Sequence, residues 1–112
     1  MPIANCIVTP KHQEQLDSVG NLIELWANES SISSENMTIN IITSNEQHGK
    51  RYRIIATLLL PTIWSDSDVS SLQIGLAKAL SIYFNALPDQ ILVCTSMINS
   101  GMVVESSEEV KW

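Results

Sequence analysis

The chain has few basic residues and lacks the segments that direct a protein into or across a membrane. It contains 6 Lys and Arg against 12 Asp and Glu, which gives a net charge of −6 and a pI near 4.6. Such an acidic chain repels the phosphate backbone of nucleic acids and anionic lipids. No run of about 18 apolar residues is present, and the start lacks the basic and long apolar regions of a secretory signal. We therefore expect a cytoplasmic protein with no nucleic-acid or membrane partner.

Cysteine and histidine are also scarce. Cys6 and Cys94 lie within apolar runs without C-x-x-C spacing, and His12 and His48 are 36 positions apart. Zinc and thiol redox sites need such ligands at short, characteristic spacings. We expect two buried thiols, no metal site and no cofactor.

Apolar residues, by contrast, make up 45% of the 112 residues. This length and composition predict one domain, 1–112, that folds around a single core. Alternating or continuous apolar runs predict four strands at 3–8, 38–43, 52–60 and 91–95. Apolar residues at spacings of three and four predict helices at 13–28 and 66–86, the second with Ser65 as N-cap and Pro88 beyond its end. The tail, 101–112, predicts a short hairpin.

The predicted elements follow the order β-α-β-β-α-β and repeat once. Identical residues recur 52 positions apart, for example Thr43 and Thr95, which divides the chain into halves of about 1–50 and 51–112. Right-handed β-α-β units place both helices on one face of a four-stranded sheet, so the fold class is α+β. Both faces of the predicted strands are apolar, and we therefore expect the uncovered face to bury itself against copies of the chain.

Two segments carry a resemblance to a known family. MPIANCIV, with proline directly after the initiator methionine, and ENMTINIITSN, within a duplicated β-α-β chain of this length, resemble the tautomerase superfamily. The resemblance implies a third strand antiparallel to the first and a homotrimer whose sheets form the inner barrel.

Pro2 is the candidate catalytic residue. Once Met1 is removed, its secondary amine can accept a proton, and an apolar pocket lowers the pKa of that amine towards working pH. The resemblance then implies a tautomerase-like isomerase that moves a proton on a small enolisable carbonyl acid. A small-molecule substrate is therefore the expected ligand.

The residues expected to bind the substrate depart from the family pattern. The loop arginine of the family falls near Lys11 or His12, depending on a one-residue gap, and its position in the second repeat is Trp64. Arg51 and Arg53 are the only arginines, and they precede the repeat position of Pro2. We name Trp64, Lys11 and Arg53 as candidate substrate-binding residues, with Arg53 at the far end of the first strand from Pro2 of the same chain.

Two other functions remain open. One is a non-catalytic protein of the tautomerase fold that binds a small apolar ligand or a protein partner. The other is a ferredoxin-like regulatory module, for which a free N-terminal proline has no use.

Overall fold

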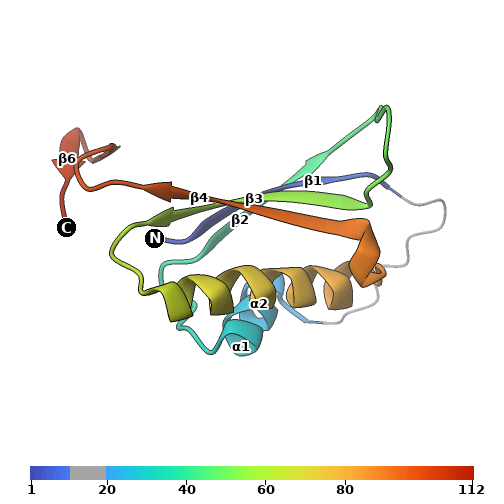
Figure 1. Cartoon of the computed structure of the whole chain (residues 1–112), viewed down its shortest axis with the longest axis horizontal. Coiled ribbons are helices and arrows are strands. Elements are labelled where there is room, and N and C mark those ends of the chain that lie inside the picture. The colour runs from blue at the N-terminus through green and yellow to red at the C-terminus, as the bar shows by residue number, and fades with distance from the viewer. Residues whose placement is uncertain (11–19) are drawn as a thin grey trace.

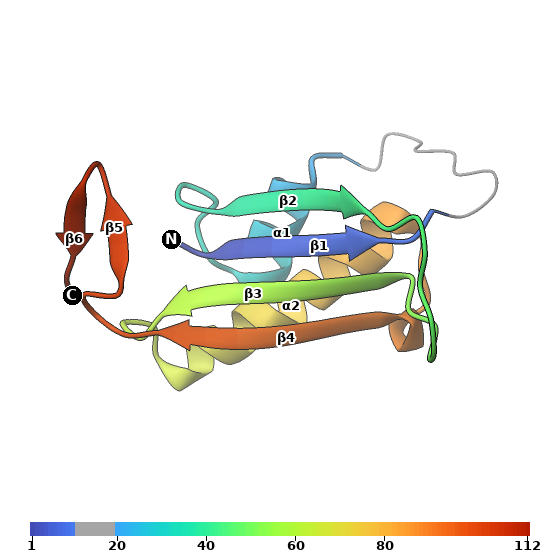
Figure 2. The same ribbon diagram turned by 90° about the horizontal axis from the view of Figure 1, so that it is seen from above.

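The computed structural model describes residues 1–10 and 20–112. Within them, a four-stranded sheet has the order β2-β1-β3-β4 and lies over two helices (Figures 1 and 2). The elements are β1 (Ile3–Val8), α1 (Leu22–Ser30), β2 (Thr38–Thr43), β3 (Ile54–Pro61), α2 (Asp66–Phe84), the 3-10 helix η1 (Pro88–Gln90), β4 (Ile91–Ile98), β5 (Val103–Glu105) and β6 (Glu108–Val110). The predicted α+β class and duplicated β-α-β architecture are thus confirmed.

The strand pairing follows the repeat. β1 pairs in parallel with β2, β3 pairs in parallel with β4, and β1 and β3 join the two halves as antiparallel neighbours. β1 and β2 have the predicted bounds, whereas β3 begins at Ile54 instead of residue 52 and β4 continues to Ile98 instead of ending at 95. The antiparallel arrangement of the first and third strands is confirmed.

The first helix is shorter than predicted. It begins at Leu22, because Gly20 has φ +96° and the side chain of Asn21 accepts a hydrogen bond from the Ile23 amide at 2.8 Å, which caps the helix at this point. The prediction of one helix over 13–28 is therefore wrong at residues 20 and 21, and residues 13–19 lie outside the described residues. The helix ends at Ser30, where Ser31 adopts a left-handed conformation.

The second helix begins where the sequence predicted. The hydroxyl of Ser65 accepts a hydrogen bond from the Asp68 amide at 3.1 Å, which confirms the N-cap. α2 ends at Phe84, two residues before the predicted end, because Asn85 adopts a left-handed conformation with φ 51°. Among the described helices, none is long and apolar enough to cross a membrane.

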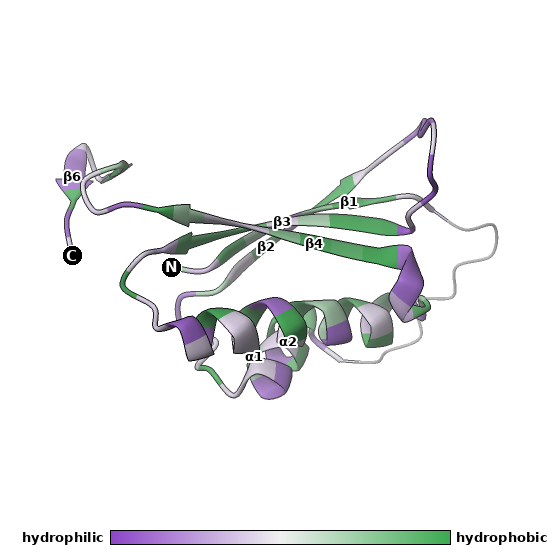
Figure 3. Cartoon of the chain, in the orientation of Figure 1, coloured by the Kyte–Doolittle hydropathy of each residue, from purple (hydrophilic) through white to green (hydrophobic). Residues whose placement is uncertain are grey.

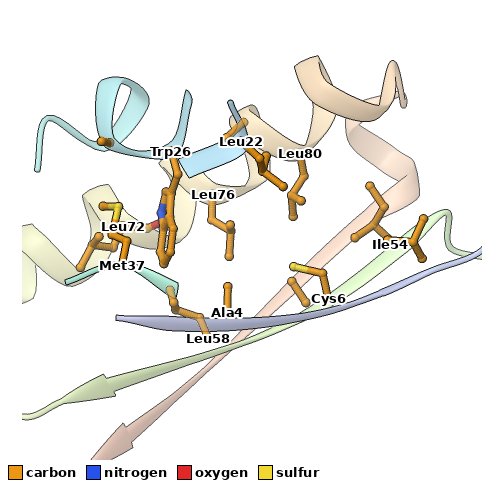
Figure 4. Packing of buried hydrophobic residues seen from close by; sticks show 14 of the residues in the cluster. Ala4, Cys6, Leu22, Trp26, Met37, Ile54, Leu58, Leu72, Leu76 and Leu80 are labelled. Carbon is orange, nitrogen blue, oxygen red and sulfur yellow. The ribbon is translucent and has the colours of Figure 1, made fainter. Parts of the chain in front are cut away.

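The core lies between the helices and one face of the sheet (Figure 4). Trp26 of α1 is fully buried there, and its indole nitrogen donates a hydrogen bond to the Leu72 carbonyl of α2 at 3.0 Å. Without this bond, burial of the indole would leave its N–H group with no hydrogen-bond acceptor. The sheet contributes every second residue of β1 and β3 to this core, and these buried residues are Ala4, Cys6, Val8, Ile54, Ala56, Leu58 and Leu60.

The other face of the sheet is largely apolar, and no described element covers it (Figure 1). Strand register places on this face Ile3, Ile7, Ile42, Ile55, Leu59, Leu92, Cys94 and Ile98. We call these residues the open face. The strands that form the sheet are largely hydrophobic (Figure 3). Because Cys94 is exposed on this face, the prediction of two buried thiols holds for Cys6 and is wrong for Cys94 in the single chain.

The C-terminal hairpin predicted within 101–112 is present. The sequence favoured a turn over residues 106–109, but Glu108 and Glu109 belong to β6 and the turn is shorter. β5 and β6 pair antiparallel around a turn in which Ser106 and Ser107 have φ of 54° and 65°. This two-residue turn with positive φ at both positions matches the twist of a β-hairpin. The hairpin lies beyond the end of the sheet, close to the N-terminus (Figure 2).

Candidate functional site

Pro2 is held at the start of β1, at one end of the sheet. Its carbonyl accepts a hydrogen bond from the Thr38 amide at 3.0 Å, which fixes it against the first residue of β2. On the other side, β3 pairs Leu59 with Ile3, so that the end of β3 lies beside the N-terminus. The side chain of Pro2 is fully buried.

A cleft of about 520 Å³ opens at the N-terminus. Three parts of the chain form its walls: the N-terminus with Met1 and Ile3, the segment that leads into β2, and strand β5. The described lining residues are Met1, Ile3, Glu35, Asn36, Met37, Thr38, Val103, Val104 and Glu105. Since the Pro2 nitrogen is bonded to Met1, removal of Met1 would leave that nitrogen next to this cleft.

The amino group at this end of the chain is electrostatically perturbed. The pKa of the Met1 α-amino group is lowered, mainly because burial disfavours the ammonium form, while the negative charge of Glu105 acts in the opposite direction. An amine with a lowered pKa is neutral in a larger fraction of molecules near neutral pH. It is therefore better able to accept a proton.

The charged side chains that line the cleft are both acidic. Glu35 reaches it from the segment between α1 and β2, and Glu105 from the end of β5. No described lysine or arginine lines it. The sequence analysis did not identify either glutamate, because they are 70 positions apart and only the fold of the hairpin brings them to one cleft.

Arg53 lies at the other end of the sheet. Its carbonyl accepts a hydrogen bond from the Thr9 amide just beyond β1, so that the length of β1 separates it from Pro2. Its guanidinium is buried 5.6 Å from the ring centroid of Phe84, and burial lowers its pKa. Together with Arg51 it lines a separate pocket of about 200 Å³. Its role in substrate binding stays a prediction, and within one chain it is not part of the cleft at Pro2.

The other two candidate residues have different outcomes. Trp64 follows β3 at the same end of the sheet as Pro2 and donates its backbone N–H to the Pro61 carbonyl at 3.3 Å. Its half-buried indole packs against the core, and Trp64 is not among the described residues that line the cleft. Its role in substrate binding therefore stays a prediction. Lys11 lies outside the described residues.

Among the described residues, no group of three or more His, Cys, Asp or Glu side chains is placed to hold a metal ion. The ionisable groups that the described lining brings to the cleft are the amine of Met1 and the carboxylates of Glu35 and Glu105.

The chain is similar to known proteins in its structure, whereas its sequence matches no family model and no curated protein. Among solved structures, the asymmetric trimer of F6 fused 4-OT superposes with a TM-score of 0.75 at 11% identity, covering 96% of this chain and 94% of that chain. Pt0534 inactivated by 2-oxo-3-pentynoate gives 0.70 at 7% identity, with the same coverage. The macrophage migration inhibitory factor of Trichinella spiralis gives 0.64 at 15% identity, covering 96% of this chain and 98% of that one. The chain thus has, over nearly its whole length, the fold of the tautomerase superfamily.

Proposed function

We propose that the chain, after removal of Met1, is a tautomerase that moves a proton on a small enolisable carbonyl compound. The observation that carries this proposal is the position of Pro2, which is buried at the head of β1 between Met1 and Ile3, two of the residues that line a cleft of about 520 Å³. The fold, which the chain has in common with fused 4-OT, supports the same reaction class.

The proposed reaction uses Pro2 as the general base. Its nitrogen takes the proton from the enol oxygen or from a carbon beside the carbonyl, and the resulting ammonium returns the proton to the other end of the conjugated system. Burial disfavours the ammonium form and so lowers the pKa of the amine, as it already does for the amino group of Met1. Proline also restricts the direction of its nitrogen, because the ring is fixed in the packed side of β1.

We further propose that the working form is a homotrimer. The open face exposes large apolar side chains, with Ile7 at 42% and Ile42 at 51% of their surface accessible. An apolar sheet face of this kind is stabilised by burial against other copies. Asn5 and Asn40, also on this face, satisfy each other through a 2.8 Å hydrogen bond, which allows them to be buried there. A trimer is also the form of the fused 4-OT structure.

A second candidate is a non-catalytic protein of the same fold that binds a small apolar ligand or a protein. The absence of a described cation from the cleft favours it, because an enolate that forms there would lack a positive partner within the described residues. The tautomerase proposal therefore includes the assembly: Lys11, Arg53 or Trp64 of another copy would supply the substrate contacts that the described cleft lacks.

The test uses protein made without an N-terminal tag. Intact mass establishes whether Met1 is absent, and ketonisation of phenylenolpyruvate and of its methyl ester is then followed by loss of the enol absorbance. We expect Pro2→Ala to lower the rate by on the order of 10² to 10⁴, the usual contribution of a positioned general acid or base. Pro88→Ala is the matched control, since Pro88 is exposed at the start of η1. Equal inactivity of the processed wild type and Pro2→Ala on both enols would favour the non-catalytic candidate.

A further inference from the structure

We propose that the cleft at Pro2 selects substrates without a carboxylate group, and that Glu105, assisted by Glu35, is the residue that excludes acids. The inference rests on the proposed function and specifies its substrate class. It departs from the enolisable acid expected from sequence, and favours instead an uncharged enol, ketone or ester.

The two carboxylates reach the cleft from independent parts of the fold. Glu105 is the last residue of β5 and pairs with Glu108 across the turn of the hairpin. The hairpin is closed by a hydrogen bond from the Gly101 amide to the Val110 carbonyl at 3.0 Å. Glu35 is held in the segment before β2, where its amide donates to the Ser33 hydroxyl at 3.3 Å. Two backbone-anchored acidic residues therefore line the same cleft.

Glu105 lines the same cleft as Met1, at the end of the chain that carries Pro2. Its negative charge opposes the effect of burial on the pKa of the Met1 amine. The same field that stabilises a positive charge there raises the energy of a negative charge brought beside it. A substrate carboxylate next to the amine would therefore be repelled, whereas a neutral carbonyl compound would not.

Within residues 1–10 and 20–112, neither carboxylate forms an ion pair. The ion pair found there joins His48 and Glu46, which follow β2 at the end of the sheet opposite Pro2. Three of the basic residues, Lys50, Arg51 and Arg53, lie just before β3, at the end of the sheet opposite Pro2. Among the described residues, no ion pair therefore offsets the negative charge of the cleft.

The first experiment compares an acid with its uncharged counterpart. Phenylenolpyruvate and its methyl ester contain the same enol and differ by the carboxylate charge. We expect the processed wild type to prefer the ester, and expect Glu105→Gln to raise kcat/KM for the acid relative to the ester by roughly 3- to 10-fold, with a smaller rise for Glu35→Gln. Added salt should reduce the effect, since the side chains are exposed. Because a change in the pKa of the amine affects both substrates, the acid-to-ester ratio isolates the repulsion.

The matched control is Glu108→Gln, which removes the same charge from the other strand of the hairpin. Glu108 does not line the cleft, so its substitution should leave the acid-to-ester ratio within about two-fold of wild type. A ratio unchanged in Glu105→Gln, or changed equally in Glu108→Gln, would overturn the proposed selectivity. This includes the case in which a basic side chain of a neighbouring copy neutralises Glu105.

A second readout does not depend on turnover. 2-Oxo-3-pentynoate, which inactivates the structurally similar Pt0534, is an ynone acid, and its methyl ester is the uncharged form. The amine nitrogen adds to the alkyne carbon distal to the ketone, a C–N bond forms, and the amine proton moves to the adjacent carbon without a leaving group. In a Cys94→Ala background, which removes the exposed thiol that would also add to the ynone, intact mass gives the labelling rate of each reagent. We expect the acid-to-ester ratio of these rates to rise in Glu105→Gln.

The two readouts separate the two proposals. A shifted labelling ratio without turnover of either enol would support the selectivity of the cleft and overturn the isomerase proposal. Turnover that depends on Pro2, with unchanged ratios in both assays, would support the isomerase and overturn the selectivity. No labelling by either reagent and no turnover would overturn both.

Discussion

The indole nitrogen of Trp112 donates a 2.9 Å hydrogen bond to the hydroxyl of Thr62. This contact joins the end of the chain to the segment that follows β3, fifty positions earlier. The backbone nitrogen of Trp112 also donates to the Ser100 hydroxyl at 2.8 Å, at the start of the loop that enters the hairpin. The hairpin that carries Glu105 into the cleft is therefore tethered at its base, and its position depends on the last residue.

We predict that Trp112→Phe loosens the hairpin without unfolding the core. The substitution keeps an aromatic ring and removes the indole donor, and a hydrogen bond at an exposed site is worth about 0.5–1.5 kcal/mol. Amide hydrogen exchange should accelerate roughly 2- to 10-fold over Val103–Glu105 and Glu108–Val110, while β1 amides keep their protection.

Thr62→Val supplies the control for this prediction, since it removes the acceptor instead of the donor. It should accelerate exchange to a similar extent, and the double variant should add little to either single change. Fully additive effects would mean that Trp112 and Thr62 act through separate contacts.

A second prediction concerns the contact between the two helices. A Cβ atom built at Gly75 of α2 would lie 2.8 Å from both the Cβ and the amide nitrogen of Ser30 in α1. Ser30 is buried and donates its hydroxyl to the Trp26 carbonyl at 2.6 Å, so it has little freedom to move. Alanine improves helix propensity by about 1 kcal/mol, but overpacking costs about 1–3 kcal/mol. We expect Gly75→Ala to lower the free energy of unfolding in urea.

The neighbouring residue Ile74 provides the comparison, because it is 54% exposed on the same helix. Ile74→Ala should change the free energy of unfolding by less than about 0.5 kcal/mol. A Gly75→Ala protein that is more stable than wild type would show that the helices separate at no cost.

The sequence predicted the parts of the fold that depend on local patterns. Alternation of apolar residues gave the bounds of β1 and β2, and Ser65 gave the start of α2, because a strand or a helix cap is specified by adjacent residues. The start of α1 was not predicted, because the helical spacing of apolar residues extends to both sides of Gly20 and Asn21. The positive φ of Gly20 and the N-cap hydrogen bond of Asn21 make the helix begin at Leu22 in spite of that spacing.

The candidate site was predicted only in part. Pro2 was singled out because MPIANCIV resembles the start of tautomerase-superfamily chains and because removal of Met1 would give Pro2 a basic secondary amine. Glu35 and Glu105 had no local signal, since exposed glutamates in loops and hairpin turns usually face solvent. Glu105 reaches the cleft on the hairpin, whose base is held by the contact between Trp112 and Thr62, residues fifty positions apart, and Glu35 reaches it from the segment before β2.

A third prediction concerns pH and the buried thiol. Burial raises the pKa of Cys6 from an ordinary 9.0 to about 11. In the unfolded chain the thiol ionises near the ordinary value, while in the folded chain it stays neutral up to about 11. The folded state therefore binds more protons between these values, so its stability falls as pH rises through this window, by up to about 1.4 kcal/mol per unit.

Urea denaturation measured below and within this window checks the prediction. Cys6→Ala should be less stable at neutral pH, because it removes core volume, but it should lose less stability than wild type as pH rises. Cys94→Ala keeps the buried thiol and should follow the wild-type slope. Parallel pH profiles for wild type and Cys6→Ala would contradict the assigned cause.

The last prediction tests the proposed trimer through two isoleucines of similar exposure. Ile42 lies on the open face and is 51% exposed, whereas Ile74 lies on α2 and is 54% exposed. If the open face is buried between copies, Ile42→Lys places an unpaired charge in an apolar interface and should dissociate the assembly. Ile74→Lys places the same charge on the helical surface and should not.

Light scattering at micromolar concentration should give three times the 12.4 kDa chain mass for wild type and Ile74→Lys, and a lower mass for Ile42→Lys. The thiol of Cys94 gives an independent readout, because it lies on the same open face. In the trimer it should react slowly with a water-soluble thiol reagent, and in Ile42→Lys it should react at the rate of an exposed cysteine. A wild-type chain that is monomeric and labels rapidly at Cys94 would contradict the trimer, because the open face would then be in contact with water.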